Sequence, residues 1–195
     1  MATDKKVQFV CFETTLDKEP FMKRWEEYTR SSNSNADLTL QQSEQKGIFR
    51  YIAQHRFLSG ELQFVFSKKP RASKVVQTQI KTTQPGGYAI LQAERMDAAA
   101  ANERKIFIFL TDPQADLAAY KELPATFKLN IYEAYYENCK YAYVLEYFVK
   151  AKDAELLQEQ LKLHDATDVD IYKELAPVKN LNKNNKEKEF FVWPT

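Results

Sequence analysis

Tyrosines and one histidine are the residues of this sequence whose chemistry suggests a site. Tyr132, Tyr143 and Tyr147 fall in two neighbouring runs of strand-like sequence, and Tyr51 and His55 fall in an earlier run. A tyrosine combines an apolar ring with a hydroxyl that can orient a ligand, as small-molecule pockets require. An imidazole can act as a general base near neutral pH. We therefore predict a ligand-binding surface of these five residues, with His55 as the candidate catalytic residue and a structural, hydrogen-bonded His55 as the alternative.

The segment from Lys105 to Leu175 contains the elements that must position the three later tyrosines. Its apolar periodicity, its Asp112-Pro113 and Asp153 helix starts and its turn residues predict a strand, a helix, two strands, a helix and a strand. The expected ranges are 105–111, 113–123, 127–136, 140–150, 154–164 and 168–175. This order is the split βαβ, or ferredoxin-like, arrangement, with an antiparallel sheet and both helices on one face.

The hairpin of the two middle strands decides which tyrosines share a face. If Asn138-Cys139 is a two-residue turn, paired residue numbers sum to 277, and alternation then places Tyr132, Tyr143 and Tyr147 together. Leu129, Ile131, Ala142, Val144 and Phe148 fall on the other face, which small aliphatic residues mark as the helix side. The tyrosine face is then open, and an open apolar face of this size is normally covered.

A fainter copy of the same order precedes this segment. The two halves align at an offset of 92, which places Tyr51 on Tyr143 and His55 on Tyr147. We therefore expect an α+β protein of two tandem ferredoxin-like (βαββαβ) repeats that pack sheet against sheet. The expected ranges are 6–92 for the first repeat, 93–104 for a linker, 105–178 for the second repeat, and 179–195 for a polar linker with an apolar tail.

The side on which His55 lies has two interpretations. Carrying the face assignment across from the second half puts Tyr51 and His55 on the open face. That assignment turns the polar residues Gln54 and Arg56 towards the helices, where apolar residues are expected. The alternative is a shifted strand register, which puts Gln54 and Arg56 in the cavity and His55 near the core.

Composition narrows the class of protein. The net charge of +1 argues against a strongly basic nucleic-acid binder, and two cysteines do not form a disulfide framework. No signal peptide precedes Val7 and no apolar run approaches membrane length, so we expect a cytoplasmic protein without a membrane segment. No residue spacing indicates a metal site, and no cofactor is expected.

The element order and the aromatic-rich sheets resemble the dimeric α+β barrel superfamily, fused into one chain. The superfamily includes antibiotic-biosynthesis-type monooxygenases, EthD-like proteins and haem-degrading enzymes, which use the cleft between sheet and helices or the barrel interior. The Asn, Trp and His pattern of the haem-degrading branch is not recognisable in this sequence. The resemblance implies a small-molecule-binding protein, with a cofactor-independent, monooxygenase-like activity left open, for a small aromatic or polyketide-like ligand.

A second resemblance concerns the same strands. Ile106-Phe107-Ile108 and Tyr141-Ala-Tyr-Val144 are similar to the two RNP motifs of RRM domains, whose aromatic residues stack bases. The alternative function is therefore an interaction or RRM-like RNA-binding module on the open tyrosine face. The oligomeric state, monomer or homo-oligomer, stays open.

Overall fold

The computed structural model describes residues 6–30, 37–57, 80–135, 139–164, 166 and 169–175. The sequence also predicts a short helix at 61–68, a strand at 75–83, and solvated acids at Asp165 and Asp168. The helix, the start of that strand, the two aspartates and the apolar tail within 179–195 lie outside the described residues. None of the helices in the described ranges is long and apolar enough to cross a membrane.

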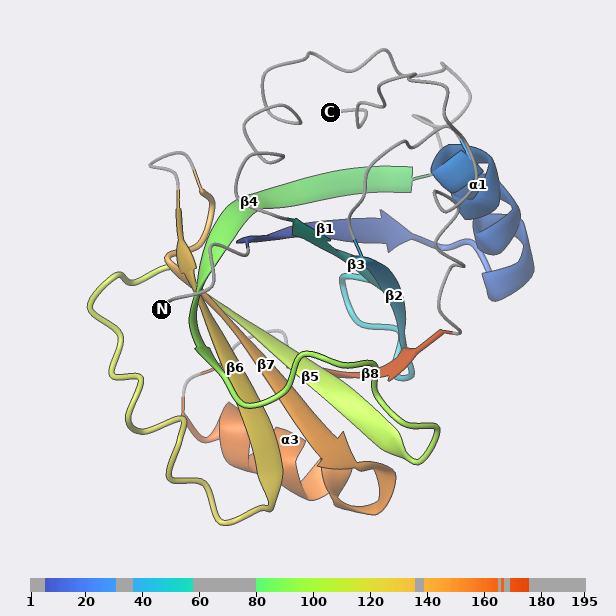
Figure 1. Ribbon diagram of the computed structural model, residues 1–195. Coiled ribbons are helices and arrows are strands. Elements are labelled where there is room, and N and C mark those ends of the chain that lie inside the picture. The colour runs from blue at the N-terminus through green and yellow to red at the C-terminus, as the bar shows by residue number, and fades with distance from the viewer. Residues whose placement is uncertain are drawn as a thin grey trace.

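Eight antiparallel strands close into a barrel (Figure 1). In chain order they are β1 (Lys6–Thr14), β2 (Asp37–Ser43), β3 (Tyr51–Phe57), β4 (Ile80–Ala93), β5 (Glu103–Leu110), β6 (Phe127–Ala134), β7 (Tyr143–Lys150) and β8 (Asp170–Glu174). Around the barrel the order is β1-β3-β2-β8-β5-β7-β6-β4. The strands of the first half are therefore neighbours in the order β4-β1-β3-β2, and those of the second half in the matching order β8-β5-β7-β6.

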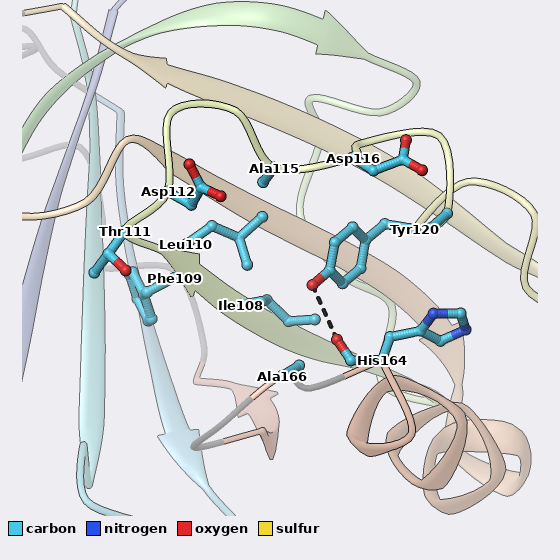
Figure 2. Close-up of a pocket in the computed structure, with 11 residues that line it drawn as sticks. Ile108, Phe109, Leu110, Thr111, Asp112, Ala115, Asp116, Tyr120, His164 and Ala166 are labelled. Carbon is cyan, nitrogen blue, oxygen red and sulfur yellow. Dashed lines mark hydrogen bonds between the residues drawn. The ribbon is translucent and has the colours of Figure 1, made fainter.

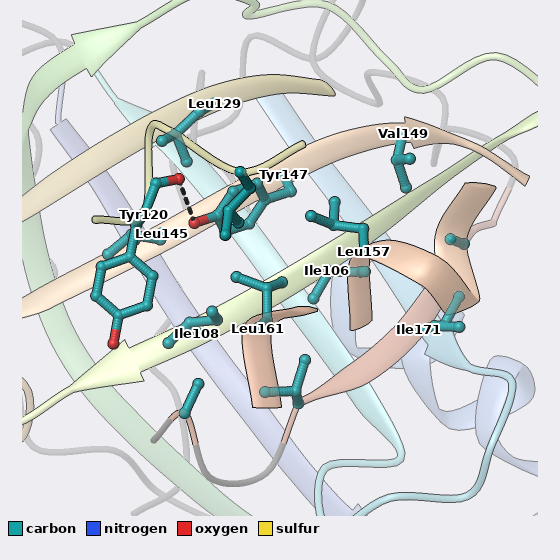
Figure 3. Packing of buried hydrophobic residues seen from close by; sticks show 14 of the residues in the cluster. Ile106, Ile108, Tyr120, Leu129, Leu145, Tyr147, Val149, Leu157, Leu161 and Ile171 are labelled. Carbon is teal, nitrogen blue, oxygen red and sulfur yellow. Dashed lines mark hydrogen bonds between the residues drawn. The ribbon is translucent and has the colours of Figure 1, made fainter. Parts of the chain in front are cut away.

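Two helices lie outside the barrel, on different sides of it: α1 (Lys18–Arg30) and α3 (Ala154–Lys162), the latter preceded by a short 3-10 turn, η1 (Ala151–Asp153). The buried face of α3 consists of Ala154, Leu157 and Leu161, which the helical period places in one stripe. This stripe packs on Ile106, Ile108, Leu145, Tyr147 and other residues of the outer sheet face (Figure 3). Burial of this stripe explains why so short a helix is stable.

The barrel interior is filled by an apolar cluster to which almost every strand contributes. Its members include Val7, Phe9, Cys11, Ile52, Tyr88, Phe107, Tyr132, Val144 and Tyr172. Phe9 lies at its centre, with edge-to-face contacts to Tyr88 at 5.7 Å, Phe107 at 6.1 Å and Tyr132 at 5.2 Å between ring centroids. Because a strand alternates its side chains between faces, these residues establish which positions of each strand point inward.

The hairpin of β6 and β7 differs from the expected register by one residue. Tyr132 pairs with Val144 and Leu129 with Tyr147, so paired numbers sum to 276. The two-residue turn was therefore the wrong basis for the register, and a slip of one residue turns every side chain of one strand to the other face. The prediction that Tyr132 shares a face with Tyr143 and Tyr147 is wrong for this reason.

Two further segments differ from expectation. Residues 113–123 form successive turns in place of a helix, because the Asp112 and Asp116 carboxylates accept hydrogen bonds from the backbone N–H groups of Gln114 and Ala118, which competes with helical bonding. Strand β4 continues through Pro85-Gly86-Gly87, where we expected a turn. Gly86 has φ +129°, and a Cβ atom there would lie 2.5 Å from the Sγ of Cys139, so only glycine fits.

Candidate functional site

The five predicted site residues lie in three different places. Tyr132 lies in the barrel interior. Tyr143 and Tyr147 lie outside the barrel, in the cluster covered by α3. Tyr51 belongs to the corresponding cluster under α1, and His55 has the same strand parity on β3. The structure thus does not bring these five residues together into one surface.

His55 is 3% exposed, and burial lowers its pKa to about 3. An imidazole with this pKa stays neutral at physiological pH and is a weak proton acceptor. Gln54 and Arg56 point into the barrel, as the alternative register predicted: Gln54 accepts a hydrogen bond from Lys105 there. Burial of His55 therefore favours a structural role over the role of a general base.

The polar centre of the barrel interior is built around Lys105. Its Nζ lies 2.9 Å from Oε1 of Glu146 and 2.8 Å from Oε2 of Glu174, and it donates to Oε1 of Gln54 at 3.2 Å. Tyr132 donates its hydroxyl to Oε2 of Glu146 at 2.5 Å. Lys105 and Glu146 are both fully buried. Each of the two ions offsets the free-energy cost of burying the charge of the other.

The charge states of this centre are set by its surroundings. Burial would raise the pKa of Glu146, but Lys105 and Arg56 outweigh burial and hold it below its usual value. Burial and the Glu146 charge raise the pKa of Tyr132 well above that of a free phenol. The segment after β4 covers this end of the barrel: Asn130 accepts from the N–H groups of Glu94 and Arg95 at 3.0 and 3.1 Å. The centre is therefore a buried network of ion pairs and hydrogen bonds that joins strands of both halves.

An open cleft lies on the outer face of the second half. Its volume is about 350 Å³, and it lies between the end of β5, the 111–120 segment and the residues that follow α3 (Figure 2). The lining residues are Ile108, Phe109, Leu110, Thr111, Asp112, Ala115, Asp116, Ala119, Tyr120, His164 and Ala166. Apolar side chains form its floor, the Tyr120 ring forms one wall, and the two carboxylates lie along the loop above. The lining is as polar as it is apolar, so the cleft offers a ligand both an apolar floor and charged groups.

Two of the predicted tyrosines hold the loop that forms this cleft. The hydroxyl of Tyr147 donates to the backbone carbonyl of Tyr120 at 3.0 Å (Figure 3), and that of Tyr143 donates to the carbonyl of Pro113 at 3.1 Å. The Tyr120 hydroxyl in turn donates to the carbonyl of His164 at 3.3 Å, which fixes its ring. Tyr143 and Tyr147 are thus supports of the cleft, while Tyr120 lines it.

The corresponding place in the first half is filled. There the ring of Phe21, from α1, stacks on Tyr51 with a centroid distance of 3.7 Å, and Trp25 stacks beyond it at 6.5 Å from Phe21. The Tyr51 hydroxyl donates to the carbonyl of Leu16, as Tyr143 does to Pro113. In the second half, turns replace the helix; Tyr120 and Leu123 still pack on the sheet, and the cleft remains beside the Tyr120 ring.

Solved structures with the same architecture have very different sequences. An anthrone oxidase-like protein superposes with a TM-score of 0.54 at 13% identity, covering 90% of this chain and 93% of that one. A variant chlorite dismutase from Candidatus Nitrospira defluvii superposes with a TM-score of 0.50 at 10% identity over 94% of this chain and 96% of that one. A further chlorite dismutase-like protein gives a TM-score of 0.53 at 8% identity over 92% and 98%.

The chain has the dimeric α+β barrel fold. The resemblance drawn from element order is therefore confirmed at the level of fold. No protein-family model matches the sequence, and no curated protein matches it either. The closed barrel encloses the inner face of the sheet, and Phe107 is 1% exposed there. Phe107 therefore cannot stack a base, and the RRM-like alternative loses one of the aromatic residues of its two motifs.

The cleft does not fit haem, which the haem-degrading proteins of the resemblance described above would bring to mind as a ligand. A haem carries two carboxylates, which need cationic partners, whereas the charged side chains lining this cleft are the carboxylates of Asp112 and Asp116. The imidazole of His164 is exposed and lies at the edge of the cleft, beyond the Tyr120 ring (Figure 2). We derive no chemistry through haem.

Sequence reasoning did not find Asp112, Asp116, Tyr120 or His164 as site residues. Tyr120 was expected on the apolar face of a helix, and Asp112 was expected to start that helix. The signal that was available is the short stretch from Asp112 to Pro124, which contains two aspartates four residues apart and three alanines. Such a stretch favours consecutive turns, and turns leave room beside a sheet that a helix would fill.

Proposed function

We propose that this protein binds a planar, largely apolar aromatic small molecule in the cleft lined by Tyr120. The single observation that supports this most is the 350 Å³ cleft, with an apolar floor and an aromatic wall, at a place that α1 fills in the first half. Tyr120 is 8% exposed, so the ligand would contact the accessible part of its ring, and this contact and the burial of a flat apolar ligand are both favourable. A polyketide-like compound has this shape.

Filling the cleft tests the binding function. Ala119 lines the cleft, whereas Ala118 beside it is exposed and does not. We expect Ala119→Phe to abolish binding of acridine, a planar aromatic probe followed by its fluorescence, and Ala118→Phe to leave binding unchanged. Retained affinity in Ala119→Phe, with the fold intact by circular dichroism, would place the ligand elsewhere or nowhere.

We further propose that a bound ligand with an acidic C–H group can react with oxygen without a cofactor. The similarity of fold to an anthrone oxidase-like protein supports testing anthrone itself. Removal of a ring CH₂ proton leaves a carbanion that gives its electrons to O₂; a second proton is then lost, one oxygen atom becomes the new carbonyl of anthraquinone, and the other leaves as water. His164 and the two carboxylates are the groups at the cleft that can accept a proton.

Oxygen uptake with anthrone separates catalysis from binding. We expect the rate above the uncatalysed background to fall in His164→Gln while acridine affinity changes little, because His164 lies at the edge of the cleft. A rate equal to background in the unaltered protein would leave a binding function without oxidation.

The organisation behind this site is proposed from the strand order. We infer two ferredoxin-like repeats, at 6–92 and 105–178, joined by 93–104. The matching orders β4-β1-β3-β2 and β8-β5-β7-β6 support this division. We also place the protein in the cytoplasm, where the free thiols of Cys11 and Cys139 would persist.

A further inference from the structure

The charge of the cleft restricts which aromatic ligand it accepts. Asp112 and Asp116 are both exposed carboxylates on the lining, and none of the lining residues is Lys or Arg. We propose, on the basis of the binding function above, that the cleft selects a planar aromatic cation, such as a protonated aromatic amine or a quaternary nitrogen heterocycle, over neutral and anionic rings of the same shape.

The two carboxylates are held in place by their own loop. One oxygen of Asp112 accepts the N–H of Gln114 at 2.8 Å, and one oxygen of Asp116 accepts the N–H of Ala118 at 3.0 Å. Both carboxylates lie on the same loop, on either side of Ala115 (Figure 2). The two carboxylates are therefore already ordered before a ligand binds. A ligand on the apolar floor would have both negative charges on one side, and binding would not have to order these side chains.

The Tyr120 ring, which forms one wall of the cleft, also favours a cationic ligand. The Tyr120 ring is held by the hydrogen bond from its hydroxyl to the His164 carbonyl, and the carbonyl of Tyr120 is held by Tyr147. The face of a tyrosine ring attracts cations. A ring cation in the cleft would thus interact with the accessible part of the Tyr120 ring, which is 8% exposed, and with the carboxylates, whereas a ligand carboxylate would be repelled by Asp112 and Asp116.

Three probes of one shape test this inference: 9-aminoacridine, which is a cation at pH 8, acridine, which is neutral, and acridine-9-carboxylate, which is an anion. We expect the cation to bind at least tenfold more tightly than the anion at low salt, which corresponds to about 1.4 kcal/mol. The neutral ring should lie between them. Because the carboxylates are exposed, the preference should shrink as salt is raised from about 10 to 300 mM.

Charge-neutral variants identify the groups responsible. In Asp112→Asn/Asp116→Asn the amide oxygens still accept the two loop hydrogen bonds, so we expect the preference for the cation to disappear while acridine still binds. Glu133→Gln/Glu155→Gln changes net charge by the same amount at exposed positions that do not line the cleft. This control should keep the preference.

The outcomes separate the two proposals. Equal binding of the three probes, or a preference that survives in Asp112→Asn/Asp116→Asn, would overturn the charge inference and leave the binding function standing. Failure of all three probes to bind the unaltered protein would overturn both.

Discussion

Replacing Lys105 by methionine is the sharpest test of the buried polar centre. The lysine ammonium is fully buried and contacts Glu146 at 2.9 Å, Glu174 at 2.8 Å and the Gln54 amide oxygen at 3.2 Å. Methionine has a similar length and no charge, so it would leave two carboxylates without their shared cation. Removing one partner of a buried ion pair costs about 3–5 kcal/mol. For a chain of this size that lowers Tm by roughly 6–20 °C.

The pH dependence gives this prediction a definite sign. In the unaltered protein the folded-state pKa of Glu146 is lowered, so its stabilising contribution is present above the unfolded value of about 4.3 and is lost as pH falls through the folded value. Without Lys105, burial is opposed only by Arg56 and by the hydrogen bond from Tyr132, and the folded-state pKa of Glu146 rises. A raised pKa destabilises the fold as pH increases through it. The stability difference between variant and unaltered protein should therefore be largest near pH 7.5 and shrink towards pH 5.

Urea unfolding followed by circular dichroism at both pH values measures this difference. Lys128→Met is the matched control, because Lys128 is an exposed lysine on strand β6 of the same barrel, and it should change stability by less than about 0.5 kcal/mol. A loss below about 1 kcal/mol for Lys105→Met, or a difference that stays constant or grows as pH falls, would refute the reasoning.

Three further predictions follow from single contacts. Tyr147→Phe removes the buried hydrogen bond to the Tyr120 carbonyl and should cost about 1–2 kcal/mol in urea unfolding while weakening acridine binding. Leu157→Ala, at a fully buried position of α3, should cost about 2–5 kcal/mol by the same measurement, against less than about 0.5 for Leu156→Ala, which is 52% exposed. His55, with a folded pKa of about 3, should destabilise the protein as pH falls below about 6.5, by up to roughly 1.4 kcal/mol per unit, and His55→Gln should flatten that dependence.

Each of these has a result that contradicts it. Unchanged acridine affinity in Tyr147→Phe would mean that the cleft wall does not depend on this bond. Equal losses for Leu157→Ala and Leu156→Ala would mean that α3 does not pack on the sheet by the assigned face. A parallel fall in stability with acid for His55→Gln and the unaltered protein would mean that His55 is not buried in the neutral form.

The sequence by itself determined most of the second half. The run Lys105-Ile-Phe-Ile predicted a strand buried on both faces, and all four residues of β5 there are buried. The period of Leu157 and Leu161 predicted a helix with one buried face, which α3 has. The element order indicated the dimeric α+β barrel fold. These signals are local: strand and helix periods depend on which residues a segment must bury, and the chain records that directly.

Only the tertiary structure decided which residues meet. The pairing sum of 276 in the β6–β7 hairpin depends on the geometry of the connection, and that one-residue difference moved Tyr143 and Tyr147 from the expected open face to the helix side. Lys105 looked like the edge of an apolar run, yet it finds Glu146 and Glu174 on the two strands beside β5. Closure of the barrel makes those contacts, and no local pattern reports them.

The cleft is the other feature that required the structure. Asp112, Asp116 and Tyr120 lie on one loop, but Ile108 comes from β5 and His164 and Ala166 come after α3. Their juxtaposition follows from hydrogen bonds that Tyr143 and Tyr147 make to the loop across the sheet face. The sequence specifies the residues that can bind an aromatic ring. Their arrangement into a cleft follows from the long-range packing of sheet, loop and helix, because only that packing leaves the space beside Tyr120 unfilled.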